Sequence, residues 1–111
     1  MKSFAKLSTA LLAAAVLVSG AAHAQATQVI TAATAKNLSD ETPVTIKGKI
    51  IRKLAKESYE LQDASGKVRV DIDDDETRGS NIIGKTVTIT GELDKKRDGS
   101  VEIETDYLQI H

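Results

Sequence analysis

Eight basic residues in three short stretches of this chain are the side chains best suited to bind a negatively charged group. They are Arg52, Lys53, Lys56, Lys67, Arg69, Lys95, Lys96 and Arg97. Ammonium and guanidinium groups bind phosphates and carboxylates through charge-assisted hydrogen bonds, and several of them together attract an anion from solution. The hypothesis of a single anion-binding rim requires a fold that brings these stretches together. Otherwise they belong to separate solvated turns.

An acidic run offers a different chemistry. Its members are Asp71, Asp73, Asp74, Asp75 and Glu76. Carboxylate oxygens at adjacent and alternating positions of a turn are the ligands that calcium and magnesium prefer. The run does not have the glycine and the distal glutamate at the spacing of an EF-hand loop. A divalent-cation site is therefore the alternative hypothesis, beside a solvated loop whose acids cap a helical turn or discourage strand pairing.

Catalytic chemistry finds little support in the composition. The chain has no cysteine and two histidines, so thiol chemistry and cysteine-bound zinc are excluded. Glu102 and Glu104 share one strand face, but on an outer surface both would be hydrated, and neither would gain the raised pKa of a general acid. We expect Lys67 and Arg69 to face them as a structural charge ladder. The sequence predicts a binding protein and not an enzyme.

The N-terminal segment has the pattern of a secretory signal peptide. Two lysines precede an apolar stretch, and two alanines mark a cleavage site after Ala24. The apolar stretch is too short to span a bilayer. We therefore expect export to the periplasm, with a signal peptide at 1–24, one domain at 25–111 and no membrane span in the mature protein. Loss of the two lysines changes the formal net charge from −1 to −3, which argues against general binding to nucleic acid.

Alternation of apolar and polar residues from Val44 onward predicts a β protein. The expected strands are 43–54, 57–63, 67–73, 85–94 and 100–110. The first strand is long, and Ile51 breaks its alternation, so we expect a bulge there. Gly48 and Gly91 are expected where strands bend or where another backbone comes close. Five strands with a long, bent first strand are typical of the oligonucleotide/oligosaccharide-binding (OB) barrel.

A short amphipathic helix is expected before the barrel, at residues 28–36, with Val29 and Ile30 buried. The segment 74–84 is too short for more than one helical turn, so we expect the N-terminal helix to plug one end of the barrel. In OB barrels the loop after the first strand and the loop before the fifth flank the ligand face, which would place the basic residues around one rim. The strands between these loops expose no aromatic residue on which a base could stack, so nucleic acid is not an expected partner.

Three segments, read in order, resemble one known family. Residues 40–50 (DETPVTIKGKI), 59–73 (YELQDASGKVRVDID) and 87–95 (VTITGELDK) are similar to segments of the bacterial OB-fold family of small periplasmic stress-tolerance proteins. The similarity extends over nearly the whole mature chain, although residues 77–79 (TRG) stand where that family usually has a tryptophan. The resemblance implies an OB barrel with an N-terminal plugging helix, a periplasmic location and a role in stress tolerance. It implies no catalytic residues.

The sequence thus predicts a mostly-β protein, a five-stranded OB barrel with a short N-terminal α-helix. Its expected function is non-enzymatic binding of a small molecule, a glycan or another anionic envelope ligand at the basic rim, in support of envelope stress tolerance. The alternative is a divalent-cation-binding protein that uses residues 71–76. No cofactor is predicted apart from that cation, and we expect a monomer.

Overall fold

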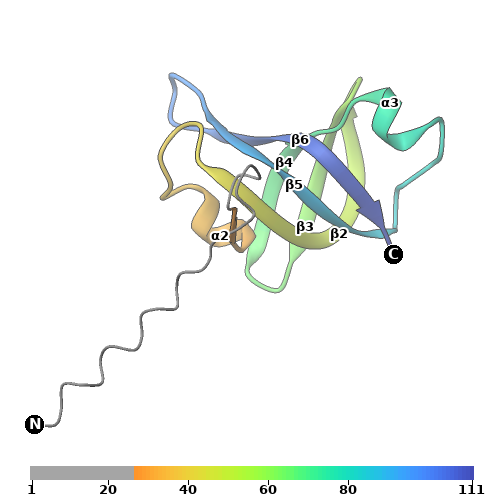
Figure 1. Cartoon of the computed structure of the whole chain (residues 1–111), viewed down its shortest axis with the longest axis horizontal. Coiled ribbons are helices and arrows are strands. Elements are labelled where there is room, and N and C mark those ends of the chain that lie inside the picture. Colours follow the sequence, from red (N-terminus) through yellow and green to blue (C-terminus); the bar gives the residue numbers. More distant parts are fainter. Residues whose placement is uncertain (1–26) are drawn as a thin grey trace, which may run out of the picture.

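The structure, a computed structural model, describes residues 27–111, and the predicted signal peptide at 1–24 lies outside the described residues. The described part contains short helices and strands wound into a barrel (Figure 1). In chain order the elements are β1 (Gln28–Val29), α2 (Ala32–Ala35), β2 (Pro43–Ala55), β3 (Ser58–Asp63), β4 (Gly66–Asp71), α3 (Asp74–Thr77), β5 (Thr86–Lys95) and β6 (Val101–Ile110). Strands β2 to β6 correspond to the five predicted strands.

These five strands close into an OB barrel, which confirms the predicted fold class. The order across the sheet is β1-β2-β3-β4-β6-β5, and β5 pairs in turn with β2. Strand β4 runs parallel to β6, whereas β2–β3, β3–β4, β2–β5 and β5–β6 are antiparallel. The long strand β2 serves both halves of the barrel, since Lys49 pairs with Gln62 on one side and Thr86 on the other. Its register with β3 shifts between Ile50 and Arg52, which is the predicted bulge.

Two glycines allow neighbouring strands to approach closely. A Cβ at Gly48 would lie 2.5 Å from Leu61 Cδ2 and 2.7 Å from the carbonyl oxygen of Gln62. A Cβ at Gly91 would overlap the carbonyl oxygen of Glu104. The prediction of a close approach at both glycines is confirmed, and closure of the barrel depends on the missing side chains.

Apolar side chains that alternate along the strands fill the barrel. The large side chains that are fully buried are Ile46, Ile50, Leu61, Ile72, Ile82, Ile89, Leu93, Ile103, Val44, Val70 and Val87. Successive side chains of a strand point to opposite faces. The polar and charged residues between the buried ones therefore lie on the outside of the barrel, where a ligand can reach them.

The segment before the barrel differs from the helix predicted at 28–36. Gln28 and Val29 form β1, which pairs in parallel with the start of β2, and the helix covers only Ala32–Ala35. Because neighbouring side chains of extended chain point to opposite sides, Ile30 is buried whereas Val29 is 82% exposed. The prediction of burial is confirmed for Ile30 and wrong for Val29.

Helix α2 packs against the β3–β4 hairpin, and α3 lies at the other end of the barrel (Figure 1). Ala32 and Ala35 of α2 are fully buried. The Ala32 N–H donates to Asp63 Oδ2 and the Ala33 N–H donates to Ser65 Oγ, each at 2.9 Å. Helix α2 thus takes the plugging position predicted for it. Neither described helix has the length and apolar surface needed to cross a membrane.

Candidate ligand-binding face

The basic residues near the β2–β3 turn are engaged within their own hairpin. Arg52 Nε lies 2.9 Å from Glu60 Oε1, and the ammonium of Lys53 lies 5.5 Å from the centre of the Tyr59 ring. Such cation–π and ion-pair contacts keep both side chains on the hairpin. Lys56 forms no ion pair with any residue in the described part of the chain.

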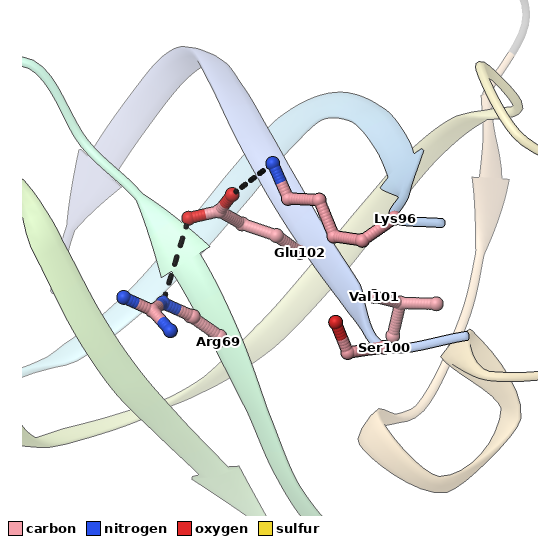
Figure 2. A pocket seen from close by; sticks show the side chains of 5 residues that line it. All are labelled: Arg69, Lys96, Ser100, Val101 and Glu102. Carbon is pink, nitrogen blue, oxygen red and sulfur yellow. Dashed lines mark ion pairs between the residues drawn. The ribbon is translucent and has the colours of Figure 1, made fainter. Parts of the chain in front are cut away.

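A hollow of about 360 Å³ opens beside β4, β6 and the β5–β6 turn, and it is called here the β4–β6 hollow. It is lined by Arg69, Lys96, Ser100, Val101 and Glu102 (Figure 2). Two residues of the predicted rim, Arg69 and Lys96, therefore meet at one place although they are far apart in the sequence. The other six residues of the predicted rim do not line the hollow.

The carboxylate of Glu102 lies between the two cations (Figure 2). Its Oε2 is 3.6 Å from Arg69 Nε and its Oε1 is 3.2 Å from Lys96 Nζ. Lys96 Nζ is also 2.7 Å from Asp94 Oδ2. Hydrogen bonds to Asp94 and Glu102 favour the charged form of Lys96 and raise its pKa above the ordinary lysine value, so this side chain is a cation.

Arg69 is anchored along one edge of its guanidinium group. Its Nε donates a hydrogen bond of 2.8 Å to the hydroxyl of Ser58, a residue buried in β3. Its two Nη groups donate to no other described residue, and 52% of the side chain is exposed. A guanidinium held in this way offers paired donors that match the oxygens of a phosphate or a carboxylate.

Backbone hydrogen bonds hold Lys96 in the β5–β6 turn. The Lys96 N–H donates to the carbonyl of Ser100 at 2.8 Å. Asp98 Oδ1 accepts from the Ser100 hydroxyl and N–H, and these bonds lower the pKa of Asp98. The Lys95 side chain lies away from the hollow, and its ammonium donates a hydrogen bond to the carbonyl of Leu38. Of the three consecutive basic residues in this region, only Lys96 lines the hollow.

The predicted charge ladder between β4 and β6 is confirmed in part. Arg69 lies opposite Glu102 and Asp71 lies opposite Glu104, whereas Lys67 lies outside the paired segment. Asp71 and Glu104 thus face each other as like charges. Partial desolvation and the neighbouring carboxylates raise the pKa of both side chains, although Glu104 remains exposed. The expectation that hydration leaves neither glutamate with a raised pKa is therefore wrong for Glu104, because the fold partly desolvates this side chain and places other carboxylates beside it.

The acidic run is divided among separate contacts. Asp71 belongs to β4, whereas Glu76 Oε1 accepts a hydrogen bond of 3.3 Å from the Leu108 N–H of β6. The Asp74 N–H at the start of α3 donates to Glu57 Oε2 at 3.0 Å. Within the described residues, no three histidine, cysteine, aspartate or glutamate side chains form a group that could hold a metal ion. The geometry therefore lends the divalent-cation alternative no support, and Glu76 instead covers part of a strand edge.

Two residues of this face do not stand out in the sequence. Ser58 is a buried serine beneath Arg69, and nothing in its local pattern indicates that contact. Asp94 could be found by counting back from the turn at Asp98, since the hairpin register places it opposite Glu102. The Ser58–Arg69 contact is a diagonal one within the β3–β4 hairpin, where Ser58 lies opposite Asp71 and Arg69 lies opposite Glu60.

Comparison with known proteins gives a family match over nearly the whole chain. The family described as "Bacterial OB fold (BOF) protein" matches residues 13–110. The chain is 40% identical over 82 residues to Protein YgiW of Escherichia coli (strain K12), which covers 73% of this chain and 62% of that protein. It is 36% identical over 73 residues to the calcium-regulated OB-fold protein CarO of Pseudomonas aeruginosa, which covers 65% of this chain and 62% of CarO. The chain thus spans less than two thirds of the length of these curated relatives.

A solved structure has the same architecture. The structure of the hypothetical protein YgiW from E. coli matches with a TM-score of 0.67 and 34% sequence identity. The match covers 78% of this chain and 91% of that chain. The barrel described above is therefore similar along most of its length to a relative of known structure.

Proposed function

We propose a binding function for this chain, which belongs to the bacterial OB-fold (BOF) family. It is a non-enzymatic protein of the periplasm that holds the anionic group of a small molecule, a glycan or another envelope component in the β4–β6 hollow, in support of envelope stress tolerance. The observation that carries the proposal is the meeting of Arg69 and Lys96 at one hollow on the outer face of the barrel. The names of the relatives describe no reaction.

The free donors of these two residues can take an anion without breaking the existing contacts. Arg69 donates its single Nε hydrogen to Ser58 and pairs with Glu102 by charge alone, at 3.6 Å, which leaves the Nη groups for a ligand. An ammonium group has three donors, and Lys96 directs its Nζ to Asp94 and Glu102, which leaves one. A phosphate or carboxylate bound to the remaining donors would bridge β4 and the β5–β6 turn.

The test is binding to envelope material with a matched pair of arginine variants. Arg69→Gln removes the guanidinium of the hollow, and Arg52→Gln removes one that is paired within the β2–β3 hairpin. We expect the parent protein and Arg52→Gln to bind sacculi or lipopolysaccharide with an affinity that falls as salt increases, since exposed charges are screened over about 10 Å at 0.1 M salt. Arg69→Gln should lose this binding. Equal binding by all three proteins would contradict the proposal.

Location and the cation alternative need separate experiments. Mass spectrometry of a periplasmic extract should find Gln25 as the first residue, as cleavage after Ala24 requires. Calorimetric titration with calcium and magnesium tests the acidic run at 71–76. A stoichiometric heat that Asp75→Asn removes would favour the cation-binding function over the anion-binding one.

A further inference from the structure

The face around the β4–β6 hollow has more carboxylates than cations. Residues directly opposite each other in a sheet lie on the same side, so β4, β6 and β5 bring five carboxylates onto one outer face. They are Asp71, Glu92, Asp94, Glu102 and Glu104. Arg69 and Lys96 are the cations beside them. A simple anion that approaches these two cations therefore also approaches an excess of negative charge.

The ion pairs of the hollow show which carboxylates a bound anion would affect. Glu102 is compensated by both Arg69 and Lys96, and Asp94 is compensated by Lys96. A second anion that shares the same cations leaves both carboxylates with less compensation, and partly desolvated charge without a partner is unfavourable. A ligand that also carries a positive group restores the balance.

We infer that the ligand of the β4–β6 hollow is zwitterionic, with an anionic group for Arg69 and Lys96 and a primary ammonium group for Asp71 and Glu104. The inference rests on the proposed function and narrows its ligand class. Asp71 and Glu104 lie two residues further along the same paired strands than Arg69 and Glu102. Two residues of extended chain span about 7 Å, so the two charges of the ligand lie within about 7 Å of each other.

The Asp71–Glu104 pair is suited to an ammonium group. The two carboxylates face each other across β4 and β6. Partial desolvation raises the pKa of both side chains. Repulsion by Asp71 adds to the raised pKa of Glu104, and Glu102 is the first of the carboxylates that raise the pKa of Asp71. An ammonium group has three donors and can bridge two carboxylates. Binding of a cation between them therefore removes a repulsion that the protein otherwise carries.

A matched series of small molecules tests the inference. ε-Aminocaproate, caproate and hexylamine share one six-carbon chain and differ in their charged ends. Calorimetric titration of the exported protein should give an affinity for ε-aminocaproate about tenfold or more above that for caproate, since a hydrogen bond to a charged group contributes about 1.5–3 kcal/mol. Hexylamine should also bind more weakly. O-phosphoethanolamine against inorganic phosphate repeats the comparison with a phosphate anion and shows which anion Arg69 prefers.

A double variant assigns the preference to the two carboxylates. Asp71→Asn with Glu104→Gln removes the ammonium subsite and leaves Arg69 and Lys96 in place. Because the substitutions remove a repulsion between like charges, the variant should fold at least as well as the parent. We expect ε-aminocaproate to lose its advantage over caproate, while caproate binds no more weakly than before.

The control double variant, Glu41→Gln with Asp75→Asn, removes the same charge from exposed side chains elsewhere and should keep the advantage. Three outcomes would overturn the inference: equal affinities for caproate and ε-aminocaproate in the parent, an advantage that survives in the Asp71 and Glu104 variant, or no binding of either zwitterion. Equal affinities leave the proposed function standing. Envelope binding that does not depend on Arg69 overturns the proposed function itself.

Discussion

Replacement of Gly91 by alanine should destabilise the barrel. Alanine has less conformational freedom than glycine in the unfolded chain, which by itself favours folding, but this gain is smaller than the cost of the contacts that the new side chain makes. The added Cβ would overlap the carbonyl oxygen of Glu104, and it would lie 2.9 Å from the carbonyl carbon of Glu104 and 3.2 Å from Thr105 Cα. All three are backbone atoms, so no change of rotamer relieves the overlap, and the β5–β6 pairing must shift. Overpacking costs about 1–3 kcal/mol, whereas the reduced entropy of the unfolded chain returns about 0.4–1 kcal/mol. We expect the free energy of unfolding to fall by the difference, about 1.3 kcal/mol.

Thermal and urea denaturation followed by circular dichroism measures this effect. In a domain of this size the melting temperature changes by about 4–8 °C per kcal/mol, so a fall of about 5–10 °C is expected. Gly99→Ala is the control, since Gly99 has a φ of +92° and nothing within 4 Å of its Cβ position. Gly99→Ala measures only the cost of placing alanine at a positive φ, about 1–2 kcal/mol, without any overlap with a neighbouring strand. An unchanged melting temperature for Gly91→Ala would refute the argument that β5 and β6 meet too closely for a side chain.

Three further predictions follow from particular contacts. Ile30→Ala should lower the free energy of unfolding by about 2–5 kcal/mol, whereas Val29→Ala should leave the melting temperature unchanged because Val29 is exposed; equal effects would contradict the extended conformation of this segment. Glu104→Gln should increase stability at neutral pH in urea denaturation. The folded protein raises the pKa of Glu104, so its charge opposes folding above that pKa, and the opposition disappears as the pH falls through the raised pKa toward the ordinary value of 4.5. The gain from Glu104→Gln should therefore vanish at about pH 4, and a gain that persists there would have another cause. Lys96→Ser should abolish salt-sensitive binding to envelope fractions while Lys95→Ser retains it, and a loss with Lys95→Ser alone would place the ligand elsewhere.

The strands are predictable because the interior of a barrel imposes a period of two on the sequence. Val87, Ile89 and Leu93 fall on one face by alternation and are all buried in β5. Gly91 interrupts the same face, which indicates a place where a side chain does not fit. Burial on one face is a local property of each strand, so a local pattern is sufficient to find it.

The helix predicted from residue 28 is wrong at its start because a long-range contact outweighs local preference there. The alanines at 32–35 favour a helix, and the apolar pattern extends that helix back to residue 28. In the structure the Ile30 N–H donates to the Thr45 carbonyl at 2.9 Å, and Gln28 lies opposite Val44. The edge of β2 thus supplies hydrogen bonds that hold these residues extended, and their own sequence does not encode that edge.

The basic residues of the site were identifiable from the sequence, but their partners were not. Parallel pairing of β4 with β6 covers Arg69 opposite Glu102 and leaves Lys67 outside. A register two residues different would have placed Lys67 opposite Glu102, and the choice between them depends on how the whole barrel closes. Lys95 likewise contacts the carbonyl of Leu38, a residue that only the folded chain brings near the end of β5.

The candidate site lies at the shortest seam of the barrel. Strand β4 pairs with β6 at three positions, from Arg69 opposite Glu102 to Asp71 opposite Glu104, whereas β5 pairs with β6 along almost its whole length. The ion pairs that join Arg69, Glu102 and Lys96 connect β4 to the β5–β6 turn across this seam. A ligand that bridges the two cations binds the closed barrel and not the open chain, so it stabilises the closure. The carboxylates whose repulsion weakens the seam are also the ones that a ligand's positive group would compensate, so the stability of this face and its selectivity depend on the same residues.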